Sequence, residues 1–133
     1  MAAPKHISKE FVEYFFTAVV PGVRPVSWEV ALHTKNPGEG DDWEVSEAGY
    51  ARVDVEFDAY EDPDGRGFWE ASNTEDVLFG AALPGEDYKV SHYTVRDKIS
   101  GECLAIGELV VPVPVVEGTS VSFPKNYLKV RGI

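Results

Sequence analysis

The stretch from Glu47 to Phe57 constrains the fold of this chain more than any other. From Ala51 onwards its apolar residues occupy every second position, and charged residues fill the positions between them. Strict alternation places the two sets on opposite faces of a β-strand, so that one face is buried and the other is wet. A strand of this kind is typical of an antiparallel sheet rather than of a parallel sheet covered on both faces.

The remaining chain supplies further short segments with strand character, separated by turns rich in Gly, Pro, Asn and Asp. The expected strands span residues 28–33, 50–57, 68–70, 76–79, 88–96, 103–109, 120–123 and 127–130. Short strands at this spacing predict a mainly β fold, an antiparallel β-sandwich that is either jelly-roll-like or a small barrel. The segment from Val110 to Val115 contains two prolines that cannot donate to a ladder, so it is expected at a sheet edge or in an extended arm.

One helix is expected, from Ser8 to Val20, with Ser8 as its N-cap and Pro21-Gly22 as its stop. Its apolar residues form a broad stripe at helical spacing, made of Phe11, Val12, Phe15, Phe16 and Val19. Such a stripe either packs on its own domain or docks on a neighbouring subunit. The expected organisation is therefore an N-terminal helical arm over residues 1–24 and a β-sandwich domain over residues 25–133.

Charge and composition indicate which classes of partner are not expected. The chain carries a net charge of −11, whereas nucleic-acid binding depends on Lys and Arg that neutralise phosphates, so no nucleic-acid partner is expected. No apolar stretch approaches the roughly 18 residues of a membrane span, so no membrane contact is expected. The single cysteine, Cys103, lies in an apolar run and is expected to be a small buried hydrophobe. Residues 1–6 lack the build of a signal peptide, which fits a protein that is made in a reducing cytoplasm.

Residues that could carry catalysis or bind metals show no recognised arrangement. His6, His33 and His92 lack metal-ligand spacing, although His33 and His92 fall on expected strands that could be neighbours. The acidic loops at 39–42 and 58–64 could bind calcium, but they do not reproduce the ligand order of an EF-hand. No nucleophile elbow, phosphate-binding loop or dinucleotide fingerprint occurs. We therefore expect no enzymatic activity, no cofactor and no metal site.

Several short motifs follow one another along the chain. They are Trp28-Glu29-Val30-Ala31-Leu32-His33-Thr34, Asn36-Pro37-Gly38, Glu44-Val45-Ser46, Gly49-Tyr50-Ala51-Arg52-Val53, Ser72-Asn73-Thr74, Val77-Leu78-Phe79, Val90-Ser91-His92-Tyr93, Gly107-Glu108-Leu109, Val116-Glu117-Gly118-Thr119 and Val121-Ser122-Phe123-Pro124. In this order they resemble a family of small structural proteins of tailed bacteriophages, commonly labelled tail fibre or minor virion proteins. The resemblance extends from Trp28 to Val130.

The resemblance implies a β-sandwich module on the virion without enzymatic activity. The chain has no heptad, collagen-like or β-helical repeat from which a long shaft could be built. A compact acidic domain with an apolar terminal helix suits a capsid decoration (cement) protein, which binds the outer face of the shell as an oligomer, commonly a trimer. The expected partners are then the major capsid protein and copies of the chain itself. The alternative is a tail-fibre or tail-tip module that binds a host receptor or glycan.

Two sets of residues are candidates for these contacts. The expected oligomer or capsid interface consists of Phe11, Phe15, Phe16 and Val19 in the helix, and Val113 and Val115 in the proline-bearing arm. The alternative receptor surface consists of the loop aromatics Tyr60, Phe68 and Trp69, which could equally cap one end of the core.

Overall fold

A computed structural model describes residues 1–19 and 24–131 of the chain. The elements are α1 (Lys5–Phe16), β1 (Trp28–His33), β2 (Val53–Val55), β3 (Phe57–Glu61), β4 (Trp69–Asn73), β5 (Val77–Leu78), β6 (Asp87–Asp97), β7 (Cys103–Val116), β8 (Ser122–Phe123) and β9 (Lys129–Arg131). Within these residues the helix is neither long nor apolar enough to cross a membrane.

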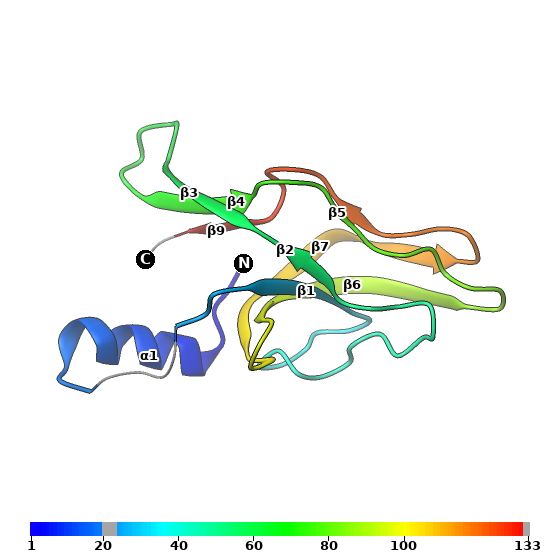
Figure 1. Ribbon diagram of the computed structural model, residues 1–133, viewed down its shortest axis with the longest axis horizontal. Coiled ribbons are helices and arrows are strands. Elements are labelled where there is room, and N and C mark those ends of the chain that lie inside the picture. The colour runs from blue at the N-terminus through cyan, green and yellow to red at the C-terminus, as the bar shows by residue number, and fades with distance from the viewer. Residues whose placement is uncertain (20–23, 132–133) are drawn as a thin grey trace.

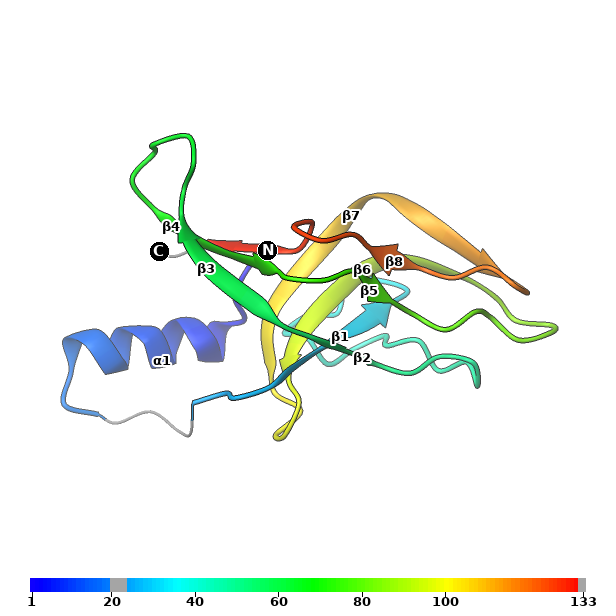
Figure 2. The same cartoon turned by 45° about the horizontal axis from the view of Figure 1, so that its top comes forward.

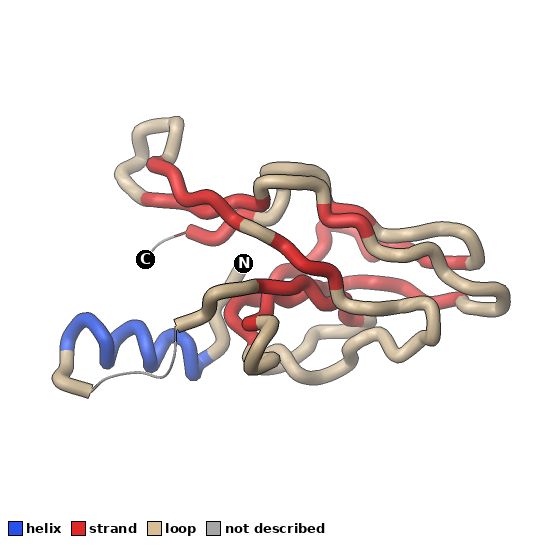
Figure 3. Tube along the Cα trace, viewed as in Figure 1, coloured by secondary structure: helices blue, strands red, loops and turns tan. Residues whose placement is uncertain are grey.

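The strands form three antiparallel sheets, with the orders β2-β1-β6-β7, β3-β4-β9 and β5-β8. The four-stranded sheet makes one layer, and the two smaller sheets lie across the core from it (Figure 1). Helix α1 stands at one end of the molecule, beside rather than over the sheets (Figure 3). The predicted mainly β sandwich with one N-terminal helix is confirmed, and the described strands form separate sheets rather than a closed barrel.

The core lies between these layers. Leu32, Val90 and Tyr93 of the four-stranded sheet meet Val77 and Phe123 of the β5-β8 pair, and all five side chains are buried. The rings of Tyr93 and Phe123 have centroids 5.1 Å apart. Burial of apolar side chains of this size contributes roughly 1.5–3 kcal/mol each, so this contact between layers is the main source of stability for the sandwich.

The alternating stretch from Glu47 to Phe57 contributes residues to two different sheets. A single strand was expected over residues 50–57, but β2 ends at Val55 and β3 begins at Phe57. At the break, the Glu56 carbonyl accepts a hydrogen bond from the Thr74 amide at 3.0 Å. Val55 is buried and Phe57 packs against the same core, so the alternation is preserved while the strand changes partner.

The helix begins three residues before the expected position. Pro4 occupies the N-cap position, and its carbonyl accepts hydrogen bonds from the amides of Ile7 and Ser8. The expected N-cap role of Ser8 is therefore wrong, because Ser8 already lies inside the first turn. The helix ends at Phe16, and the expected stop at Pro21-Gly22 lies outside the described residues, as does Val20.

The prolines lie at a sheet edge, as expected. β7 is the outer strand of the four-stranded sheet and includes both the predicted 103–109 strand and the arm that follows it. The register with β6 shifts between His92, which faces Glu108, and Val90, which faces Val113. The residues between Glu108 and Val113, which include Pro112, therefore form a large bulge, whereas Pro114 lies opposite Lys89 on the outer strand after it.

Candidate interaction surfaces

Residues 2–6 fix the start of α1 against the four-stranded sheet. Ala2 pairs with Ile106 of the β7 edge through two backbone hydrogen bonds of 2.7 Å. His6 Nε2 donates to the Cys103 carbonyl at 2.8 Å and lies 3.1 Å from a carboxylate oxygen of Glu102. These contacts set the direction in which the helix leaves the sheet.

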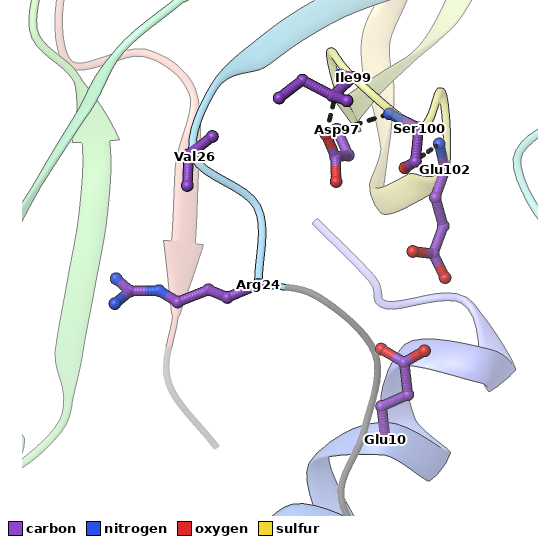
Figure 4. Close-up of a pocket in the computed structure, with 7 residues that line it drawn as sticks. All are labelled: Glu10, Arg24, Val26, Asp97, Ile99, Ser100 and Glu102. Carbon is purple, nitrogen blue, oxygen red and sulfur yellow. Dashed lines mark hydrogen bonds between the residues drawn. The ribbon is translucent and has the colours of Figure 1, made fainter.

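The half-buried residues of the helix are mixed in character: they are His6, Ile7, Glu10, Phe11 and Glu13. Glu10, four residues after His6 and therefore on the same side of the helix, lines a hollow of about 390 Å³. The other residues of this hollow come from the β6–β7 turn and the segment before β1 (Figure 4): they are Arg24, Val26, Asp97, Ile99, Ser100 and Glu102. The usual orientation, in which the apolar stripe of a surface helix faces the core, is therefore not adopted by most of this stripe.

Most of the apolar stripe is uncovered, whereas its first residue, Phe11, is half-buried. Phe15 and Phe16 are 61% and 75% exposed, Val12 and Val19 are also exposed, and no residue of α1 is buried. The Phe15 ring packs against two aromatic rings of its own helix, with centroids 4.9 Å from both Phe11 and Tyr14. Of the two expectations for the stripe, packing on its own domain is not what the structure shows. Docking on a neighbouring subunit stays a prediction.

In the proline-bearing arm of β7, the expected interface residue Val115 faces the core instead of solvent. Val115 is 1% exposed and belongs to the core, and Val113 packs against it, so Val115 is not an accessible interface residue. The physical reason is that β7 resumes its pairing with β6 after the bulge, where Val115 lies opposite Tyr88 and its side chain joins the core. The exposed residues are instead Val110, at 95%, and Val111, at 69%. Sequence reasoning missed them, although the two prolines that follow were a signal that the ladder is interrupted there.

The three loop aromatics do not form one platform. Tyr60 donates a hydrogen bond of 3.0 Å to the buried Glu70 carboxylate, and Phe68 lies between the guanidinium groups of Arg66 and Arg131. These two rings are therefore engaged within the chain. Trp69 precedes Glu70 on β4 and so points to the opposite face, where it is 60% exposed. A receptor surface made of all three aromatics is therefore wrong, and Trp69 alone remains available.

His33 and His92 are cross-strand partners, as expected for neighbours. His33 is fully buried, with Nδ1 2.8 Å from the Asp42 carbonyl and Nε2 2.9 Å from the Thr94 hydroxyl. Arg96 also donates to this hydroxyl, which leaves the Thr94 O–H available to donate a hydrogen bond to Nε2 of a neutral ring. Burial lowers the pKa of His33 below its ordinary value. Nδ1 therefore fixes the 36–44 loop, while Nε2 is bound to Thr94 of β6.

The acidic loops use their carboxylates in internal contacts. Asp41 pairs with Arg96, and Asp62 is bound by Arg66 through two hydrogen bonds that hold the pKa of Asp62 at about 2. Among residues 1–19 and 24–131, no three His, Cys, Asp or Glu side chains come together in a group that could hold a metal ion.

Comparison with known proteins identifies the family. None of the curated proteins matches this chain. A family model described as "Podophage GP4 fiber I protein gp80" matches residues 2–131, nearly the whole length, and confirms the resemblance to structural proteins of tailed phages. The chain therefore belongs to the podophage GP4 fiber I protein gp80 family and is a structural protein of a bacteriophage virion.

Proposed function

We propose that this protein is a non-enzymatic component of a phage fibre that assembles by binding copies of itself through the exposed stripe of α1. The observation that carries the proposal is the orientation of the helix, with Glu10 toward the body and Phe15 and Phe16 toward solvent. Apolar surface of this kind favours removal from water, at roughly 25 cal/mol for each Å² buried. The description of the family as a fibre protein supports a fibre over other parts of the virion.

The state of the reactive side chains supports a non-catalytic role. His33 is buried with both ring nitrogens occupied. Burial raises the pKa of the Cys103 thiol to about 11, so its nucleophilic thiolate is scarce at neutral pH. A general base or nucleophile must instead be able to reach a substrate.

A second candidate function is capsid decoration, with the outer face of the major capsid protein as partner. The compactness of the sandwich favours it, because the described residues form one small domain and the sequence has no repeat from which a shaft is built. In that case the helix stripe contacts the shell or joins copies into a trimer on it.

Self-association of the purified protein tests the proposal. Sedimentation of the full chain over a range of concentrations is expected to show a defined oligomer. The double variant Phe15→Ser/Phe16→Ser should be monomeric with an unchanged circular dichroism spectrum. The control is Leu78→Ser, an equally exposed apolar residue on β5, which should assemble normally. A wild-type protein that stays monomeric at all concentrations contradicts the proposal.

The position on the virion separates the two candidates. Tracing the chain in a cryo-electron microscopy map of the particle is expected to place it in a tail-attached fibre. Density on the capsid surface would instead support the decoration role and reject the fibre role.

A further inference from the structure

The β3-β4-β9 sheet has an apolar face that continues beyond the core. Cross-strand pairs place Ala59, Ala71 and Val130 in one row, with Phe57 on one side of this row and Trp69 on the other, all on one face. We call these five residues the acceptor face; the same side of the sheet also carries Asn73 beside Phe57 and Glu61 beside Trp69. Phe57 packs against the core, but Ala59 is exposed and Trp69 is 60% exposed, so the far part of the face is open to solvent.

The dimensions of the acceptor face suit a helix such as α1. β3 and β4 have five residues each, about 17 Å of strand, and the 12-residue α1 is about 18 Å long. The two central alanines leave room for large side chains, and α1 presents large exposed ones at Phe15 and Phe16. Next to Phe57 lies a hollow of about 260 Å³ whose lining includes the apolar Val26, Trp28 and Val55 and the charged Asp54, Glu56 and Lys98.

The helix does not cover the acceptor face of its own chain. Figures 1 and 2 show α1 and the β3-β4-β9 sheet at the same end of the molecule, with the helix beside the β6–β7 turn. The contacts of Ala2 and His6 hold it there, and Glu10 faces the body. Among the described residues, the Phe15 and Phe16 side of the helix and the Ala59 and Trp69 end of the acceptor face are therefore open to solvent in each chain.

Charged groups at the borders of the two surfaces are complementary. Lys9 lies on the same side of the helix as Phe16, about two turns before it, and its side chain is 77% exposed although it also pairs with Glu13 at 3.5 Å. Glu61, the cross-strand partner of Trp69, is an exposed carboxylate at the border of the acceptor face. In a chain with a net charge of −11, such an opposite pairing opposes the general repulsion between copies.

We propose that the apolar stripe of α1 in one copy packs on the acceptor face of a second copy, with Trp69 at the contact. This inference rests on the proposed self-association and names the surface that receives the helix. The contact joins two different surfaces and is therefore heterologous. Repetition of it closes a ring, such as the expected trimer, or builds an open fibre, depending on the rotation between copies.

Cysteine cross-linking between two variants tests the pairing directly. Phe15→Cys and Ala59→Cys are co-expressed with different tags and mildly oxidised, while the native Cys103 is buried. A disulfide between the two tagged chains is expected, and neither variant expressed alone should form one. Cross-linking of Phe15→Cys to itself would indicate helix-to-helix pairing and would overturn the acceptor face while leaving self-association intact. Self-association without a cross-link between the two variants would also overturn the acceptor face and leave the proposed self-association intact.

A second measurement uses Trp69. Trp69→Ala should weaken self-association by about tenfold or more, as expected for a buried aromatic anchor at an interface. The control is Tyr60→Phe on the opposite face of the same sheet, which should leave association unchanged. Unchanged association of Trp69→Ala rejects the acceptor face but not the proposed function. A wild-type protein that never associates rejects both.

Discussion

Glu10 faces the body of the protein, and Phe15, five residues later on the same helix, is 61% exposed. Because Phe15 makes no contact with the core, its removal should not affect the stability of the monomer. We expect Phe15→Ala to change the free energy of unfolding by less than about 0.5 kcal/mol. Phe123→Ala, which empties the centre of the core, should cost about 3–5 kcal/mol. Urea unfolding at a concentration where the protein is monomeric measures both, and equal effects would contradict the assigned orientation.

The buried neutral His33 makes stability depend on pH. Its pKa is lowered in the folded state, so below its unfolded value of about 6.5 the unfolded chain binds the proton more readily. The contribution of His33 to the free energy of unfolding is therefore complete above about pH 6.5. The free energy of unfolding should decrease as the pH falls from there toward the folded-state pKa of His33.

The check for this dependence is the urea midpoint measured between pH 7.5 and pH 5. His33→Gln should lower stability at neutral pH and flatten the slope, while His92→Gln serves as the control on the neighbouring strand. A slope that His33→Gln leaves unchanged would show that other groups cause it.

Cys103 should react slowly in the native protein. Its thiol is buried, and burial raises its pKa to about 11, so both access and thiolate formation are suppressed. Labelling with a thiol reagent at pH 8 should be much slower in buffer than in urea, where the chain is unfolded. Equal rates would mean that the 36–44 loop, which covers Cys103 at Gly40, opens readily.

Gly107 should tolerate no side chain. A Cβ at this position would overlap the ring of Tyr93, which fills the space beside the glycine. Gly107→Ala should therefore cost about 1–3 kcal/mol through overpacking. Gly80→Ala is a matched control, because its Cβ would lie 3.6 Å from the nearest atom, the Gly49 carbonyl oxygen. Thermal unfolding of the two variants should separate them clearly, and similar midpoints would contradict the packing of Tyr93.

Part of the candidate surface could be predicted from the sequence. The apolar stripe of Phe11, Phe15 and Phe16 follows from helical spacing alone, and the edge position of β7 follows from the missing donors of Pro112 and Pro114. Both properties belong to the local chain. The burial of Val115 could not be predicted in this way, because it depends on how far the strand continues after its bulge.

The sequence by itself determined the alternation from Ala51 to Phe57, the amphipathic helix and the mainly β fold, because periodicity is set by the backbone geometry of each segment. Only the tertiary structure decided that this alternating strand changes sheets at Glu56 and that Glu10 rather than Phe15 faces the body. A periodic pattern specifies which residues share a face but not which surface that face meets. The direction of α1 depends instead on contacts distant in sequence, such as those of Ala2 with Ile106 and of His6 with Cys103.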